Sequence, residues 1–91
     1  MSMEARIRKS LMLALEPTRL DVENQSHLHA GHAGSPGTGE SHYAVLVVSP
    51  RFSGLSRVAR HRLVNAALAA ELATGIHALA IRALAPGEPV S

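Results

Sequence analysis

The sequence predicts a small α+β domain with a three-stranded mixed sheet and helices packed on one face of that sheet. A chain of 91 residues has room for one core of two packed layers. Two segments carry the apolar spacing of helices and three carry that of strands, in the order helix, strand, strand, helix, strand. Hydrophobic residues make up 46% of the chain and aromatic residues only 2%, so we expect an aliphatic core.

The first predicted element is a helix at the start of the chain. Ile7, Leu11 and Leu15 recur every four residues, which places them on one face of a helix. Pro17 ends it. A basic amphipathic start is also typical of a mitochondrial transit peptide, but Glu4 and the direct run into the domain favour a structural helix.

Two strands are expected next. Residues 19–25 alternate, with Leu20 and Val22 on one face, as in a half-buried strand. Residues 41–49 contain an apolar run that faces both ways, which is typical of the middle strand of a small sheet, and Pro50 ends this strand.

A long second helix and a third strand complete the domain. Ser56 is the expected N-cap of a helix that runs to about residue 73, and Gly75 suits the C′ position. Two apolar stripes predict that this helix packs on two sides, against the sheet and the first helix. The stripes are Ala59, Leu63, Ala66, Ala67 and Ala70, and Val64, Leu68 and Leu72. A third strand at residues 77–84 should pair in parallel with the second, because a helix connects them. Residues 86–91 are expected to form a tail.

Histidine is concentrated in the segment between the first two strands. Residues 26–40 are rich in glycine, which predicts a long loop, and they contain His27, His29 and His32. Neutral imidazole is a common ligand of transition metals. The chain has no cysteine, so a metal centre that needs sulfur must take it from another molecule. The alternative interpretation is that this histidine-rich stretch binds metals only adventitiously, without a function.

The basic residues are unevenly placed. Residues 41–70 contain no acidic residue, although the net charge is only +2. Arg57, Arg60 and His61 are spaced i, i+3, i+4, so we expect them to share an exposed helix face that could meet phosphates, with Arg62 beside them. A solvated basic face, or a surface that docks an acidic partner, is the alternative interpretation.

Several classes of protein are not expected. No apolar run approaches the roughly 20 residues that span a bilayer. The absence of cysteine excludes a disulfide framework and favours a reducing compartment, such as the bacterial cytoplasm or a mitochondrion. No catalytic constellation or phosphate-binding glycine loop is present, so an enzyme is not expected. A metallohydrolase built on the loop histidines would have only Glu40 nearby as a general base.

Six short blocks follow one another along the chain. They are Asn24-Gln25-Ser26, Glu40-Ser41-His42-Tyr43, Val47-Val48-Ser49, Arg51-Phe52-Ser53-Gly54-Leu55-Ser56, Arg60-His61-Arg62-Leu63-Val64 and Ile76-His77-Ala78-Leu79. Over about residues 4–86 these blocks resemble the BolA family. The resemblance implies a fold related to the type II KH domain. It also implies partnership with a monothiol glutaredoxin around a shared two-iron two-sulfur cluster, and in some members DNA-linked transcriptional regulation.

The resemblance also implies the ligands of that cluster. The family's histidine at the start of the last strand falls on His77. The second ligand comes from the loop, where His29 matches by count, His32 could substitute and His27 is a third choice. His42 matches a family block and is expected to be structural. The chain thus resembles the histidine-bearing branch of the family, with thiolates supplied by a glutaredoxin cysteine and glutathione in a Rieske-like mixed ligation.

A non-enzymatic protein is therefore expected, which does not hold the cluster alone and which by itself is a monomer or a weak homodimer. The alternative is a DNA-binding regulator that uses the basic face at residues 57–62, in a region that the family likens to a helix-turn-helix. The chain lacks a Gly-x-x-Gly loop and has almost no aromatic residues for base stacking, which weakens the nucleic-acid interpretation.

Overall fold

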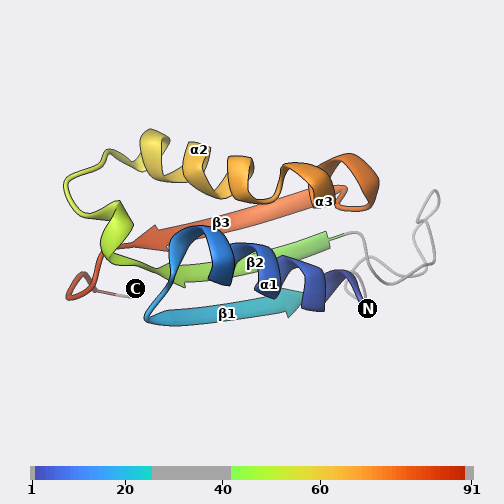
Figure 1. Ribbon diagram of the computed structural model, residues 1–91, viewed down its shortest axis with the longest axis horizontal. Coiled ribbons are helices and arrows are strands. Elements are labelled where there is room, and N and C mark those ends of the chain that lie inside the picture. The colour runs from blue at the N-terminus through green and yellow to red at the C-terminus, as the bar shows by residue number, and fades with distance from the viewer. Residues whose placement is uncertain (1, 26–41, 90–91) are drawn as a thin grey trace.

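The structure is a computed structural model that describes residues 2–25 and 42–89. Its elements are α1 (Met3–Leu15), β1 (Arg19–Asn24), β2 (His42–Val48), the short 3-10 helix η2 (Pro50–Phe52), α2 (Arg57–Ala67), α3 (Ala69–Thr74) and β3 (Ala78–Leu84). The central strand β2 pairs antiparallel with β1 and parallel with β3. The predicted α+β class, the element order and the mixed sheet are confirmed (Figure 1).

One face of the sheet carries the core. Alternate residues of the strands are buried against the helices, as the pleat of a strand requires. In Figure 1, α1 lies over β1 and β2 while α2 runs alongside β3. The buried apolar residues are Ile7, Leu11, Leu15, Val22, Tyr43, Val45, Val47, Phe52, Val64, Leu68, Ile76 and Ala85. The intervening residues on β1, and Ala78, Ala80 and Arg82 on β3, are exposed.

Hydrogen bonds at its two ends hold α1 in place. The Ser2 hydroxyl accepts from the Ala5 amide at 3.1 Å, which satisfies one of the open donors of the first turn. At the other end, the buried Ser49 hydroxyl donates to the Leu15 carbonyl at 2.6 Å. The predicted first helix is therefore confirmed as a structural element that packs on the sheet.

The long second helix is broken. Leu68 lies between α2 and α3 with a φ of −104°, and the stripe of Val64, Leu68 and Leu72 faces the core together with Ala67 of the other stripe. Of the other stripe, Ala66 and Ala70 are exposed. The expectation that this helical region packs against the sheet and the first helix is confirmed, since α2 contacts both β3 and α1.

Gly75 closes α3 in an unexpected way. Its φ of −166° is extended backbone, not the left-handed conformation expected of a C′ glycine. A Cβ atom there would lie 2.5 Å from the terminal methyl of Met3, a contact that this flexible side chain can relieve by moving. Within the described ranges, no helix is long and apolar enough to cross a membrane.

Candidate functional site

Two histidines meet where β2 and β3 begin. His42 is the first residue of β2 and lies opposite Ala78, the first residue of β3. His77 directly precedes Ala78, and its ring centroid lies 5.5 Å from that of His42, with the ring planes inclined by 53°. His77 is exposed and His42 is half-buried. The pair is therefore accessible from one end of the sheet.

The histidine-rich segment is attached at the same end. The last residue of β1, Asn24, lies opposite Tyr43, and the Gln25 amide donates to the His42 carbonyl at 2.8 Å. The chain therefore leaves the sheet and returns to it beside the two imidazoles. His27, His29 and His32 lie outside the described residues, so their predicted role stays a prediction.

The spacing of the pair fits a shared metal ligand set. Two imidazoles that ligate one metal through nitrogens about 2.1 Å from it hold their ring centroids about 5 Å apart, close to the 5.5 Å observed. In the part of the chain that the structure describes, no group of three or more potential ligands is gathered. A metal ion held by His42 and His77 would therefore need its other ligands from outside the described residues or from another molecule.

Sequence reasoning alone assigns His42 a structural role. The two histidines are far apart in the chain, and no spacing rule for helices or turns connects them. The signal that could have found the pair is the predicted parallel pairing of the second and third strands, because parallel strands place their first residues side by side.

A basic hollow lies along the outer side of β3. It has a volume of about 390 Å³ and lies between α2, β3 and the segment that follows β3. Basic side chains from two elements line it: Arg57 and His61 from α2, and Arg82 from β3. Arg57 is exposed and His61 is half-buried, while Arg62 is exposed on α2. Their contact with phosphates stays a prediction.

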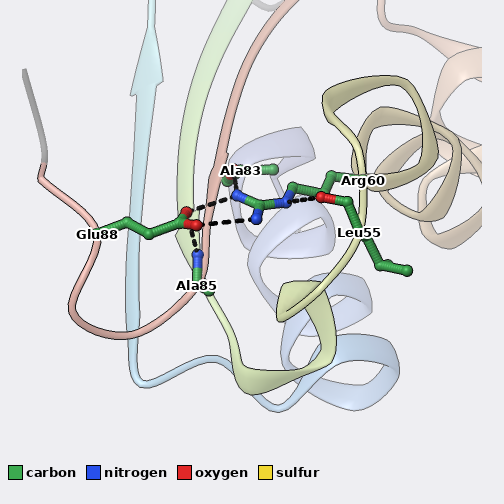
Figure 2. A network of polar contacts seen from close by, with 5 residues as sticks. All are labelled: Leu55, Arg60, Ala83, Ala85 and Glu88. Atoms are coloured by element: carbon green, nitrogen blue, oxygen red, sulfur yellow. Dashed lines mark hydrogen bonds and ion pairs between the residues drawn. The ribbon is translucent and has the colours of Figure 1, made fainter.

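Arg60 does not share that exposed face. Its guanidinium donates from Nη1 and Nη2 to the two carboxylate oxygens of Glu88, at 2.6 and 2.9 Å (Figure 2). It also donates to the carbonyls of Leu55 at 3.0 Å and Ala83 at 3.1 Å. Only 13% of the side chain is exposed. The expectation that Arg60 lies on the exposed face was wrong, because its side chain turns to these acceptors; its contact with phosphate stays a prediction.

Glu88 is held by two donors. Besides Arg60, the Ala85 amide donates to it at 2.8 Å. The hydrogen bonds from Arg60 and then from Ala85 lower the pKa of the Glu88 carboxyl from 4.5 to about 2. The segment predicted as a tail is therefore fastened to the start of α2 at least through Glu88.

A family comparison gives the relation to known proteins. The family model of BolA-like proteins matches residues 11–88. The chain belongs to the BolA family. This result confirms the resemblance found in the six sequence blocks, and it covers all the elements from the middle of α1 to the segment after β3.

Individual relatives cover the chain closely. A protein of Sinorhizobium sp named "Uncharacterized protein in cobS 5'region" is 54% identical over 90 residues, which is 98% of this chain and 97% of that protein. BolA-like protein 1 of Homo sapiens is 53% identical over 85 residues, 93% of this chain and 59% of that protein. The chain thus spans about three fifths of the mammalian relatives that carry this name.

Solved BolA structures share the fold. BolA1 from Arabidopsis thaliana superposes with a TM-score of 0.85 at 39% identity, with 99% of each chain covered. The BolA domain of SufE1 from Arabidopsis thaliana gives the same TM-score at 44% identity, with 98% of each chain covered. The BolA fold therefore accounts for the observed order of helices and strands.

Proposed function

We propose that this BolA-like protein binds a monothiol glutaredoxin and shares a two-iron two-sulfur cluster with it. The observation that carries the proposal is the contact between His42 and His77, with ring centroids 5.5 Å apart, at the end of the sheet where the histidine-rich segment is attached. Membership of the BolA family supports the same role.

The ligands from this chain are imidazoles. His77 is one of them, and the second is a histidine from His29, His32 or His42. The family pattern favours His29 or His32, whereas the described geometry favours His42, which already lies in contact with His77. When bound, the cluster supplies an iron that accepts nitrogen ligands, with its other iron held by thiolates.

The sulfur ligands come from the partner. The chain has no cysteine, so a glutaredoxin cysteine and glutathione supply the thiolates. Imidazole ligands titrate near neutral pH and are lost more readily than thiolates. A half-site of histidines therefore suits a non-enzymatic role in iron regulation or in cluster assembly and transfer, in which the cluster is held reversibly.

DNA-linked regulation is the alternative, and the geometry supports it less well. Arg57, His61 and Arg62 remain at least partly accessible to solvent, but Arg60 forms an ion pair with Glu88. The basic face thus offers fewer phosphate contacts than the sequence spacing predicts, and phosphate contacts alone select no sequence.

Single alanine substitutions at the four histidines test the ligands. The chain is co-expressed with a monothiol glutaredoxin, and the visible absorption and circular dichroism of the purified complex are recorded. We expect His77→Ala, and one of His29→Ala, His32→Ala and His42→Ala, to alter the cluster spectrum, because each removes a nitrogen ligand. His61→Ala is the matched control and should leave the spectrum unchanged, because His61 lines the hollow beside α2. Cluster spectra that are identical in wild type and His77→Ala would refute the assignment of His77.

A further inference from the structure

The strand β3 forms one edge of the sheet, and part of its backbone points away from β2. In a strand, the amide and the carbonyl of one residue point to the same side, and successive residues alternate between the two sides. The Ala83 carbonyl accepts from a side chain of α2, whereas the Leu84 carbonyl accepts from the Ser49 amide, directly after β2. Ala83 therefore points outward. The alternation places the amides and carbonyls of Ile81 and Leu79 on the same outer edge.

The ion pair between Arg60 and Glu88 closes only the last part of this edge. The Arg60 guanidinium donates to the Ala83 carbonyl at 3.1 Å, and the Ala85 amide donates to the Glu88 carboxylate at 2.8 Å (Figure 2). Within the described residues, the outward amide and carbonyl of Ile81 and the amide of Ala83 form no hydrogen bond. An unpaired strand edge is a template for pairing with another chain.

The basic hollow lies against the unpaired part of the edge. Four successive residues of β3 line it, from Ile81 to Leu84. Side chains of successive strand residues point to opposite faces of a sheet, so a hollow that touches all four lies at the edge, where their backbone is shared. Its volume of about 390 Å³ falls within the range of roughly 300–1,000 Å³ that is usual for ligand sites.

The hollow favours an acidic occupant. Arg57 and His61 line it from α2, and neither side chain has an ion pair or a hydrogen bond among the described residues. An arginine binds a carboxylate through two parallel hydrogen bonds, and an imidazole donates an N–H in its neutral form as well as in its charged form. Arg82 lines the hollow as well, but it already takes part in another interaction. A carboxylate therefore fits beside Arg57 and His61.

We propose that the outer edge of β3 binds an extended acidic segment of a partner protein, which adds a strand to the sheet and places a carboxylate in the basic hollow. The outward groups of Ile81 and Ala83 pair with the backbone of this segment, and Arg57 and His61 select its charge. In such strand addition, main-chain hydrogen bonds supply affinity and side-chain contacts supply specificity. The added strand ends where Arg60 closes the edge.

Two other occupants fit less well. A second copy of this chain, paired edge to edge, would bring its own Arg57 and His61 to the same edge, where basic groups repel one another. A nucleic acid offers phosphate acceptors to Arg57 but no amide donors along its backbone, so it would leave the Ile81 carbonyl unpaired. An acidic peptide satisfies both the charge and the backbone groups.

A short peptide tests the proposal on the chain alone, without a cluster or a glutaredoxin. The probe is Thr-Val-Glu-Val-Glu-Val-Thr with both ends capped, titrated into the ¹⁵N-labelled chain and followed by nuclear magnetic resonance. We expect the amide resonances of Ile81 and Ala83 to shift, and the hydrogen exchange of both amides to slow at least about tenfold at saturation. The internal control is the Val22 amide on the outer edge of β1, whose exchange should not change. The Val22 carbonyl on that edge accepts from Arg8 at 3.5 Å.

Modified peptides separate backbone pairing from charge. The same peptide with lysine in place of both glutamates should not bind. Two further peptides carry N-methyl groups, one at the valines and one at the glutamates, and methylation of the amides that face β3 should weaken binding at least about tenfold. If both methylated peptides bind as tightly as the parent, charge alone holds the peptide and the proposal is overturned.

Variants of the chain test the hollow. Arg57→Glu should weaken binding of the acidic peptide at least about tenfold, because it sets a like charge against the carboxylate. A glutamate at the first residue of α2 suits the helix dipole, and circular dichroism verifies the fold. Arg62→Glu is the matched control, because Arg62 is exposed on the same helix and does not line the hollow. A peptide that leaves the exchange of Ile81 unchanged overturns the proposal, and so does a duplex oligonucleotide that shifts these resonances when the peptide does not.

Discussion

The ion pair between Arg60 and Glu88 fastens the segment after β3 to the start of α2. The two groups form a bidentate contact, which is the strongest geometry available to an arginine and a carboxylate. The same guanidinium also donates hydrogen bonds to two backbone carbonyls. Among the described ion pairs, that between Arg51 and Glu16 is a useful contrast, because both of its side chains are more than half exposed.

Removal of the Glu88 charge should make stability depend on pH in a defined way. The folded-state pKa of Glu88 is about 2, below its ordinary value of 4.5. Its contribution to stability is therefore complete above pH 4.5 and is lost as the pH falls toward 2. We expect Glu88→Gln to lower the melting temperature at neutral pH, and the difference from wild type to close between these two pH values. Thermal unfolding followed by circular dichroism across this range provides the measurement.

Glu16→Gln is the matched control for that experiment. It removes the carboxylate charge from an exposed ion pair, which should change the melting temperature very little at any pH. A Glu88→Gln difference that stays constant from neutral to acid pH would contradict the account of Glu88.

Predictions for single residues were correct where they depend only on neighbours a few positions away in the sequence. The Ser56 N-cap is observed, with its hydroxyl accepting from the Ala59 amide at 3.2 Å. Helical spacing also placed Arg57, Arg60 and His61 near one another. It could not show that Arg60 turns toward Glu88, because that contact depends on how the chain folds back after β3.

At the scale of elements, one side of α2 and α3 carries the packing. Val64 and Leu68 are fully buried, whereas Leu63 remains 37% exposed. The break at Leu68 lets the chain turn while the same stripe continues into α3 through Leu72. Of the other stripe, Ala67 is partly buried against the core, whereas Ala66 and Ala70 are exposed. Alanine is a good helix former on a solvated face.

Alanine substitution of Leu68 and of Leu63 should distinguish the buried stripe from the exposed one. Leu68→Ala removes a fully buried side chain and should cost about 2–5 kcal/mol of unfolding free energy. Leu63→Ala, in the same helical region, should cost well under about 1 kcal/mol, because surface substitutions usually stay within about 0.5 kcal/mol. Urea unfolding of both variants measures the difference. Equal losses would show that the second stripe is buried after all.

Strand positions were predicted to within about one residue at each end, because hydrophobic alternation and the flanking prolines bound them. Helix continuity across Leu68 was not predicted correctly, since no glycine or proline marks the break. The contact between His42 and His77 was also missed. This contact depends on the register in which β2 and β3 pair. The sequence does not define that register, because β2 is apolar on both faces.

At the scale of the whole molecule, the histidine pair and the Arg60 ion pair lie at opposite ends of the sheet. His42 and His77 lie at the end where β2 and β3 begin, whereas Arg60 and Glu88 lie near the opposite end, where β3 leads into the C-terminal segment (Figure 1).

The most direct test of cluster sharing is the nitrogen ligation of the iron. This chain is labelled with ¹⁵N-histidine and combined with unlabelled monothiol glutaredoxin, glutathione and a reconstituted two-iron two-sulfur cluster. The hyperfine couplings of the reduced cluster are then measured by pulsed electron paramagnetic resonance. The account predicts couplings to two ¹⁵N nuclei of this chain, one of which disappears in His77→Ala. A cluster that shows no coupling to ¹⁵N would contradict it.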